Sequence, residues 1–143
     1  MTHVRFHFNV TDRTDYTCRL LRKATRQGAR VAVSGPAQAL AVLDRALWSF
    51  DPLEFVPHVL LAAGKVLPDR LRATPVCLAE RAVDAPMREV LVNLGSDTPD
   101  GFEAFDRVVE VVSTADADRV AARQRWRDYA ARGFAIERHE AAT

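Results

Sequence analysis

The sequence contains only two cysteines, Cys18 and Cys77, which is too few for a disulfide framework or a zinc site. Cys18 lies in a helical pattern and Cys77 in a run typical of a strand. We therefore expect both to be small, buried hydrophobic side chains. This low cysteine content is also what a cytoplasmic protein would show.

Long apolar runs and an excess of one charge are absent as well. No run reaches the roughly 18 residues that a membrane helix needs. The charged N-terminus, residues 1–5, precedes no apolar stretch, so we expect neither a signal peptide nor a membrane partner. With 20 basic and 19 acidic residues the net charge is +1, which does not suit a protein that coats nucleic acid unaided. Contact with nucleic acid is therefore expected to be indirect.

The motifs of catalysis are also missing. The turn after the first predicted strand, residues 9–13, has no glycine, whereas a dinucleotide fold needs a glycine-rich turn there. At the one strand–glycine–helix junction, Ser34-Gly35-Pro36, the proline has no N–H to offer a phosphate. The histidines lack the spacing of metal ligands, and no serine lies in a nucleophile elbow. We predict no catalytic residue, metal or cofactor, with a nucleotide-binding enzyme as an alternative.

The pattern that is present alternates strands with helices along 143 residues of ordinary globular composition. Alternation of apolar and polar residues predicts a first strand whose apolar side chains share one face: Val4, Phe6, Phe8 and Val10. Further strands are predicted at residues 30–34, 75–79, 89–93 and 108–112. Helices are predicted from a cap at Thr11 or Asp12 to Gly28, from Pro36 to Trp48, at 102–106, and at 113–132 with Ser113 or Thr114 as cap. Residues 59–74 give no clear pattern.

This alternation predicts one α/β domain over residues 1–143. Its fold is Rossmann-like, with a mostly parallel sheet and helices on both faces.

One face of the last predicted helix is rich in arginine. Because a helix advances about 100° per residue, Arg119, Arg123 and Arg127 fall within an arc of about 80°. Trp126 lies about 20° beyond Arg119 on the same count. Such a row suits an acidic peptide or a phosphate backbone, and a solvated helix face is the alternative. Direct binding of single-stranded DNA is also possible in principle, through this helix or through the basic face of the first: Arg19, Arg22, Lys23 and Arg26.

A second run, from Leu43 to His58, is rich in aromatic residues and proline across a helix end and a loop. Loops lie at surfaces, so part of this apolar area is exposed unless a partner covers it. Aromatic anchors dominate many protein–protein interfaces. A loop folded back over the core would explain the same residues.

Both runs resemble the chi subunit family of bacterial DNA polymerase III. The segment Leu43 to His58 is similar to the family's central signature, and Arg125 to Phe134 is similar to its last helix and cap. Residues 88–94 and 105–112 fit its middle strands, so the resemblance extends from Val4 to Phe134. It implies a non-catalytic accessory subunit with a Rossmann-like fold and no bound nucleotide. It also implies two partners, the psi subunit of the clamp loader and the acidic C-terminal tail of single-stranded-DNA-binding protein.

The resemblance implies a site for each partner. The tail would bind at Arg119, Arg123, Trp126 and Arg127, with Val112 near the pocket for its terminal phenylalanine. The family has lysines and a tyrosine there, and arginine does not simply replace lysine. Psi would bind at Trp48, Pro52 and Phe55. Asp51 stands where the family has its proline, and Pro52 follows it.

Overall fold

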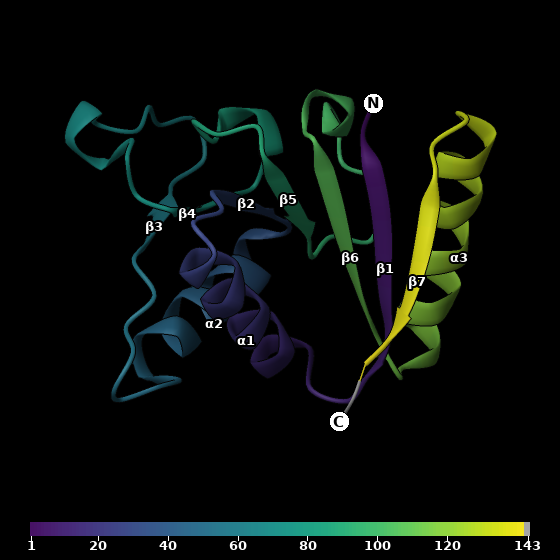
Figure 1. Ribbon diagram of the computed structural model, residues 1–143, viewed down its shortest axis with the longest axis horizontal. Coiled ribbons are helices and arrows are strands. Elements are labelled where there is room, and N and C mark those ends of the chain that lie inside the picture. Colours follow the sequence, from purple (N-terminus) through teal and green to yellow (C-terminus); the bar gives the residue numbers. More distant parts are fainter. Residues whose placement is uncertain (142–143) are drawn as a thin grey trace.

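The computed structural model describes residues 1–141, which form one sheet of seven strands (Figure 1). The strands are β1 (His3–Val10), β2 (Val31–Ser34), β3 (His58–Leu61), β4 (Val76–Ala79), β5 (Val90–Asn93), β6 (Arg107–Ser113) and β7 (Ile136–Glu140). Their order in the sheet is β3-β4-β2-β5-β6-β1-β7, so β3 and β7 are its edges. Every neighbouring pair is parallel, where the sequence predicted a mostly parallel sheet.

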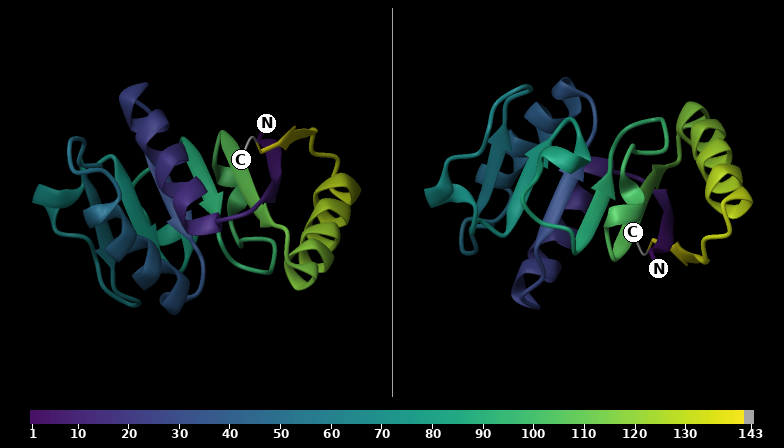
Figure 2. Two further views of the ribbon diagram at one scale, coloured as in Figure 1. Left: turned by 90° about the horizontal axis from the view of Figure 1, so that it is seen from below. Right: turned by 90° about the horizontal axis from the view of Figure 1, so that it is seen from above.

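Three α-helices cover the sheet: α1 (Arg13–Arg26), α2 (Ala37–Ser49) and α3 (Asp116–Ala131). Short 3-10 helices occur at η1 (Asp69–Leu71), η2 (Ala82–Asp84) and η3 (Phe102–Ala104). Strands of the sheet lie between α3 and the pair formed by α1 and α2 (Figure 2). The predicted Rossmann-like α/β fold with helices on both faces is therefore confirmed. No helix within residues 1–141 is long and apolar enough to cross a membrane.

Local chemistry explains where α1 begins and ends. Asp12 is the N-cap, and its side chain accepts the N–H of Asp15 at 3.0 Å. Gln27 is the C-cap, and Gly28 follows with a φ of 79°, a conformation that glycine adopts without steric cost. Both ends agree with the sequence prediction.

Two hydrophobic cores lie on opposite faces of the sheet. Val31 and Val33 of β2 pack with residues of α1 and α2, and Ala32 packs on the α3 side. Such burial on both faces is typical of central parallel strands. Cys18 and Cys77 are both fully buried free thiols, as predicted, and burial raises the pKa of each to about 11.

The prediction that Val10 shares a face with Val4, Phe6 and Phe8 is wrong. Val10 packs in the core of α1 and α2, whereas the other three contact the opposite core. The register of β1 shifts between His7 and Val10, and Asn9 has a φ of 58°. An irregularity of this kind turns the following side chain to the other face of the sheet.

Several predicted boundaries also need correction. Ser113 is the last residue of β6, and α3 begins at Asp116 with Ala115 as an N-cap that makes no side-chain bond. The Ser113 hydroxyl instead donates to Asp118 Oδ2 at 2.5 Å. Pro36 is the N-cap of α2 and not its first helical residue, because its ψ of 148° is extended. The strands β3 and β7 were not predicted at all.

His7 is a half-buried residue that packs between β1 and α1. Its Nδ1 is hydrogen-bonded to the Tyr16 hydroxyl of α1, and its ring lies 4.9 Å from that of His139. Burial, with smaller effects from the charges of His139, Arg5 and Lys23, lowers the pKa of His7 to about 4. His7 is therefore neutral in the folded chain near pH 7.

We expect His7→Gln to flatten the dependence of the unfolding free energy on pH. Between about pH 4 and pH 6.5 the unfolded chain binds more protons at this residue than the folded chain, so stability falls as the pH falls. Urea denaturation at several pH values measures the slope. The exposed His3 offers a matched control in His3→Gln. An unchanged slope in His7→Gln would contradict this expectation.

Candidate tail-binding cavity

A buried ion pair determines how α3 lies on the sheet. Glu110, in the middle of β6, is 0% exposed, and Arg125 of α3 is 4% exposed. Arg125 Nε donates to Glu110 Oε1 at 2.9 Å, and the Tyr129 hydroxyl donates to Oε2 at 2.7 Å. Asn93 of β5 donates to both carboxylate oxygens at 3.1 Å. The carboxylate is thus satisfied by donors from two elements.

The same network reaches the loop after β5. Arg125 Nη1 donates to the carbonyl oxygen of Ser96 at 2.9 Å. Burial and the charge of Glu110 raise the pKa of Tyr129 well above its ordinary value, so the phenol keeps its proton and remains a donor. Because Arg125 and Tyr129 are one turn apart and both point inward, the rotation of α3 about its axis is fixed. The residues between them must then face outward or sideways.

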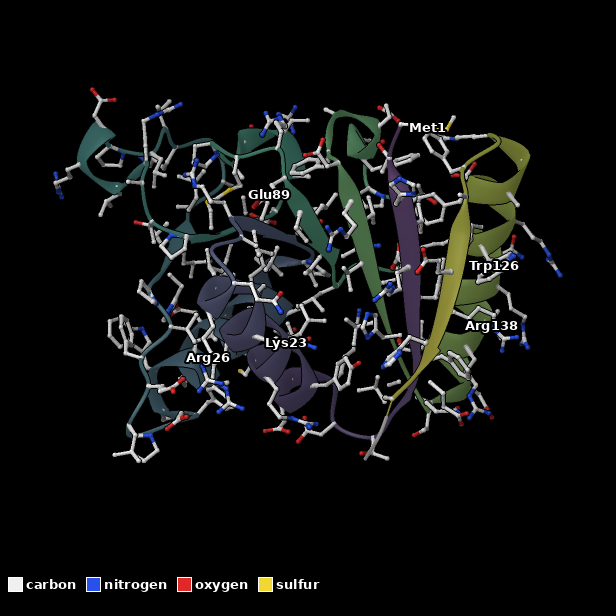
Figure 3. All side chains as sticks on the ribbon, viewed as in Figure 1. Met1, Lys23, Arg26, Glu89, Trp126 and Arg138 are labelled. Carbon is white, nitrogen blue, oxygen red and sulfur yellow. The ribbon has the colours of Figure 1, made fainter. Side chains whose placement is uncertain are left out.

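A cavity of about 400 Å³ lies between α3 and strands β1, β6 and β7. Its apolar floor consists of Phe6, Phe8, Val112, Ala122 and Trp126. Trp126 is half-buried, with its ring centroid 5.1 Å from that of Phe6. Around the floor lie three arginines, which we name the arginine rim: Arg119, Arg123 and Arg138, with Asn9 and Ser113 beside them. Figure 3 labels Trp126 and Arg138, which lie on the α3 side of the molecule beside β7.

The arginine rim carries charge that no carboxylate within residues 1–141 neutralises through an ion pair. Arg119 Nη2 donates to the neutral Asn9 side chain at 3.2 Å, and the Arg138 guanidinium lies over the Phe8 ring at 4.8 Å. None of the three rim arginines forms an ion pair with a carboxylate of residues 1–141. The rim is therefore available to an anion.

The basic face of α1 differs in this respect. Arg19 pairs with Asp15 at 3.0 Å, Arg22 pairs with Asp51 at 2.9 Å, and Arg26 pairs with Glu54. Three of its four cations are thus bound to carboxylates of the same chain. This pairing weakens the alternative of direct DNA binding through α1.

The structure brings together most of the residues predicted for the tail. Arg119, Arg123, Trp126 and Val112 all line the cavity, whereas Arg127 is exposed on α3 outside the lining. Six further residues line the cavity that were not predicted for it: Phe6, Phe8, Asn9, Ser113, Ala122 and Arg138. Phe6 and Phe8 were predicted to share one face of the first strand, but nothing in the local sequence related that face to α3. Arg138 was missed because it lies on β7, which was not predicted.

A second group of apolar side chains is exposed at the far edge of the sheet. Trp48 is 64% exposed, Leu53 92% and Phe55 52%, and we name these three with the exposed Pro52 the aromatic surface. The Trp48 and Phe55 ring centroids are 5.0 Å apart. The predicted residues Trp48, Pro52 and Phe55 are therefore all at the surface. They adjoin edge strand β3, whereas α3 lies toward edge strand β7.

Asp51 holds the loop that carries this surface. Its carboxylate accepts the N–H groups of Leu53 at 2.9 Å and Glu54 at 3.2 Å, and Arg22 donates to it at 2.9 Å. The N–H of Leu53, with Arg22 and the N–H of Glu54 adding to it, holds the pKa of Asp51 below its usual value. The Arg22 guanidinium also lies 5.0 Å from the centre of the Phe50 ring. The loop is thus fixed to α1.

The junction at Gly35 has a structural explanation. A Cβ at Gly35 would lie 3.1 Å from Leu94 Cβ, so glycine permits the close approach of two chain segments. The nearby cavity, about 390 Å³, is lined by Glu80, Asp97 and Asp100 as well as Arg81. Carboxylates at this position do not favour a phosphate. Within residues 1–141, no three histidine, cysteine or acidic side chains converge as metal ligands do.

Comparison with known proteins identifies the family of the chain. A family model described as DNA polymerase III chi subunit, HolC, matches residues 1–137. The chain belongs to the DNA polymerase III chi subunit family. It is 33% identical to DNA polymerase III subunit chi of Pseudomonas aeruginosa over 144 residues, which covers 97% of this chain and 96% of the relative. By name, the family consists of accessory subunits of the polymerase.

Two further chi subunits are similar over most of their length. That of Haemophilus influenzae is 30% identical over 121 residues, covering 84% of this chain and 81% of the relative. That of Escherichia coli is 30% identical over 119 residues, covering 82% and 78%. The resemblance drawn from the sequence is confirmed, and a partner within the replication complex follows from it.

We expect Arg125→Met to lower the unfolding free energy by about 3–5 kcal/mol, because it leaves the Glu110 charge buried without its cation. The double variant Arg125→Met with Glu110→Gln removes that charge and should recover part of the loss. Urea denaturation of the two single variants and the double variant measures the coupling. Effects of the two single changes that simply add would contradict the proposed dependence of one residue on the other.

Proposed function

We propose that this chain is a non-catalytic bridging subunit of DNA polymerase III. Its cavity would bind the acidic C-terminal tail of single-stranded-DNA-binding protein, and its aromatic surface would bind the psi subunit of the clamp loader. The observation that carries the proposal is the combination of an apolar floor with an arginine rim that pairs with no carboxylate of residues 1–141.

The chemistry of the tail matches that combination. The tail ends in proline and phenylalanine preceded by aspartates, so it has an aromatic ring, a terminal carboxylate and further negative charges. The ring would lie on the floor beside Trp126, where burial of apolar area is favourable. The aspartates would meet guanidinium groups along α3, at Arg119 and Arg123. Arg127, exposed outside the cavity, is placed for a more distant aspartate.

The expected affinity is modest. Hydrogen bonds to charged groups contribute on the order of 1.5–3 kcal/mol each, and exposed contacts of this kind weaken as salt is added. Micromolar binding is sufficient because a DNA-coating protein presents many tails at once, which supplies avidity. Because each contact is weak, one tail could also dissociate and be replaced by another.

The aromatic surface suits a different partner. Trp48, Leu53 and Phe55 expose apolar area with the rings already in contact, which is typical of an interface centre. Because the loop is fixed by Asp51 and Arg22, little order would have to be gained on binding psi. The two surfaces adjoin opposite ends of the sheet order, so both partners could bind at once.

We expect a fluorescent peptide with the C-terminal tail sequence to bind with micromolar affinity that decreases as salt is raised. Arg123→Ala should weaken it by about tenfold or more, because a charge-assisted contact is lost. Removal of the final phenylalanine from the peptide should abolish binding. Fluorescence anisotropy titration measures each of these.

Arg70→Ala is the matched control for this titration, since Arg70 is an exposed arginine on η1 away from the cavity. It should bind the tail as the parent chain does. Absence of binding by the intact tail at low salt would contradict the tail-receptor proposal. Equal weakening by Arg70→Ala would reduce the interaction to non-specific attraction of charge.

We expect Trp48→Ala to weaken binding of a purified psi subunit by about thirtyfold or more, the effect of losing a central aromatic anchor. Arg123→Ala should leave psi binding unchanged, and Trp48→Ala should leave tail binding unchanged. Isothermal titration calorimetry of both variants against both partners measures all four values. Psi binding that survives in Trp48→Ala would place the psi interface elsewhere.

A further inference from the structure

Arg138 reaches the cavity from the opposite wall to the other rim arginines. Arg119 and Arg123 lie one turn apart on α3, whereas Arg138 lies on edge strand β7. In the parallel pairing of β1 with β7, Arg138 is in register with Phe6, a residue of the apolar floor. Figure 3 shows the labelled Arg138 beside β7, close to α3 and Trp126. Arg138 is thus the rim arginine that comes from β7, whereas the other two come from α3.

The carboxylates nearest to Arg138 along β7 have other partners. Glu137 accepts from Arg5 Nη2 at 2.7 Å, and Glu140 accepts from Asn9 Nδ2 at 2.8 Å. Arg138 instead lies over the Phe8 ring at 4.8 Å, a cation–π contact that holds its guanidinium against the floor. A planar guanidinium held in this way keeps its hydrogen-bonding edge for a carboxylate.

The position of a terminal carboxylate follows from the position of its ring. In a C-terminal phenylalanine only a short link joins the ring to the carboxylate. When the ring lies on the floor, the carboxylate must therefore lie at the cavity mouth and not farther along the helix. Of the rim arginines, Arg119 donates to Asn9, while Arg123 is exposed on the helix where upstream aspartates would pass. Arg138 is the one held on a floor residue.

We propose that Arg138 binds the terminal carboxylate of the peptide and so makes the cavity specific for the free end of a chain. This inference rests on the proposed function, since it takes the acidic tail as the ligand. The rim arginines would then have two roles. Arg138 recognises the chain end, and the α3 arginines attract the aspartates. An internal aromatic flanked by the same aspartates would fill the floor but leave Arg138 without its partner.

The test compares two tail peptides that differ only at the terminus, one with a free carboxylate and one with a carboxamide. Each is titrated against the parent chain, Arg138→Gln and Arg123→Gln. The parent should prefer the free acid by about tenfold or more, as expected for one charge-assisted pair. In Arg138→Gln that preference should fall toward one, with the amidated peptide bound as well as by the parent. In Arg123→Gln both peptides should weaken while the preference remains.

The outcomes separate this inference from the proposed function. If the parent does not bind the free-acid tail, the tail-receptor proposal itself fails. If the parent binds it and Arg138→Gln keeps the full preference, Arg138 does not recognise the carboxylate. Loss of both peptides by Arg138→Gln would also overturn the inference, because Arg138 would then act on the cavity as a whole. Binding of the amidated peptide serves as the internal check that the variant is folded.

Discussion

The position of α3, and with it the cavity, depends on the buried pair between Glu110 and Arg125. A carboxylate with no exposure is costly in a sheet interior unless donors surround it, and here Arg125, Tyr129 and Asn93 all donate to one residue. An apolar pair of similar volume could stabilise the fold as well or better, so stability alone does not explain the choice. The network instead restricts α3 to one rotation, because only that rotation satisfies the charge. Trp126 then lies in the cavity floor, and Arg123 lies at its rim.

The sequence predicted the elements whose patterns are local. The cap at Asp12, the glycine after α1 and the β-branched run of β2 are read from neighbouring residues. Strand β7 escaped prediction because an edge strand is solvated and four of its five residues are polar or charged. The face of the sheet on which Val10 lies was predicted wrongly, because the irregularity in β1 depends on pairing between strands and not on the alternation of residues. For the same reason, Glu110 inside a valine-rich strand gave no sign of a partner fifteen residues later.

The residues of the candidate cavity likewise include some that local sequence predicts and some that it does not. The arginine face of α3 follows from spacing by four residues, which is a property of any helix. The opposite wall of the cavity requires β1 to pair with both β6 and β7, contacts between segments more than a hundred residues apart. Phe8 and Arg138 therefore enter the site only through the topology of the sheet. The part of the cavity that β1 and β7 supply could therefore not be predicted from the sequence of the helix alone.

The distribution of arginine explains how a nearly neutral chain presents one positive site. On α1, carboxylates of the helix itself and of the loop after α2 pair with the arginines, and these pairs fix the loop that exposes Leu53 and Phe55. The Asp51 carboxylate accepts two N–H groups of this loop, and these bonds restrict its backbone. On α3 and β7 the rim arginines pair with no carboxylate in the described part of the chain, and they contact Asn9 and the Phe8 ring instead. Arginine thus forms internal ion pairs on α1 but leaves its positive charge available at the cavity. The net charge of the chain does not show which arginines are paired. The positions of the carboxylates in the fold decide this.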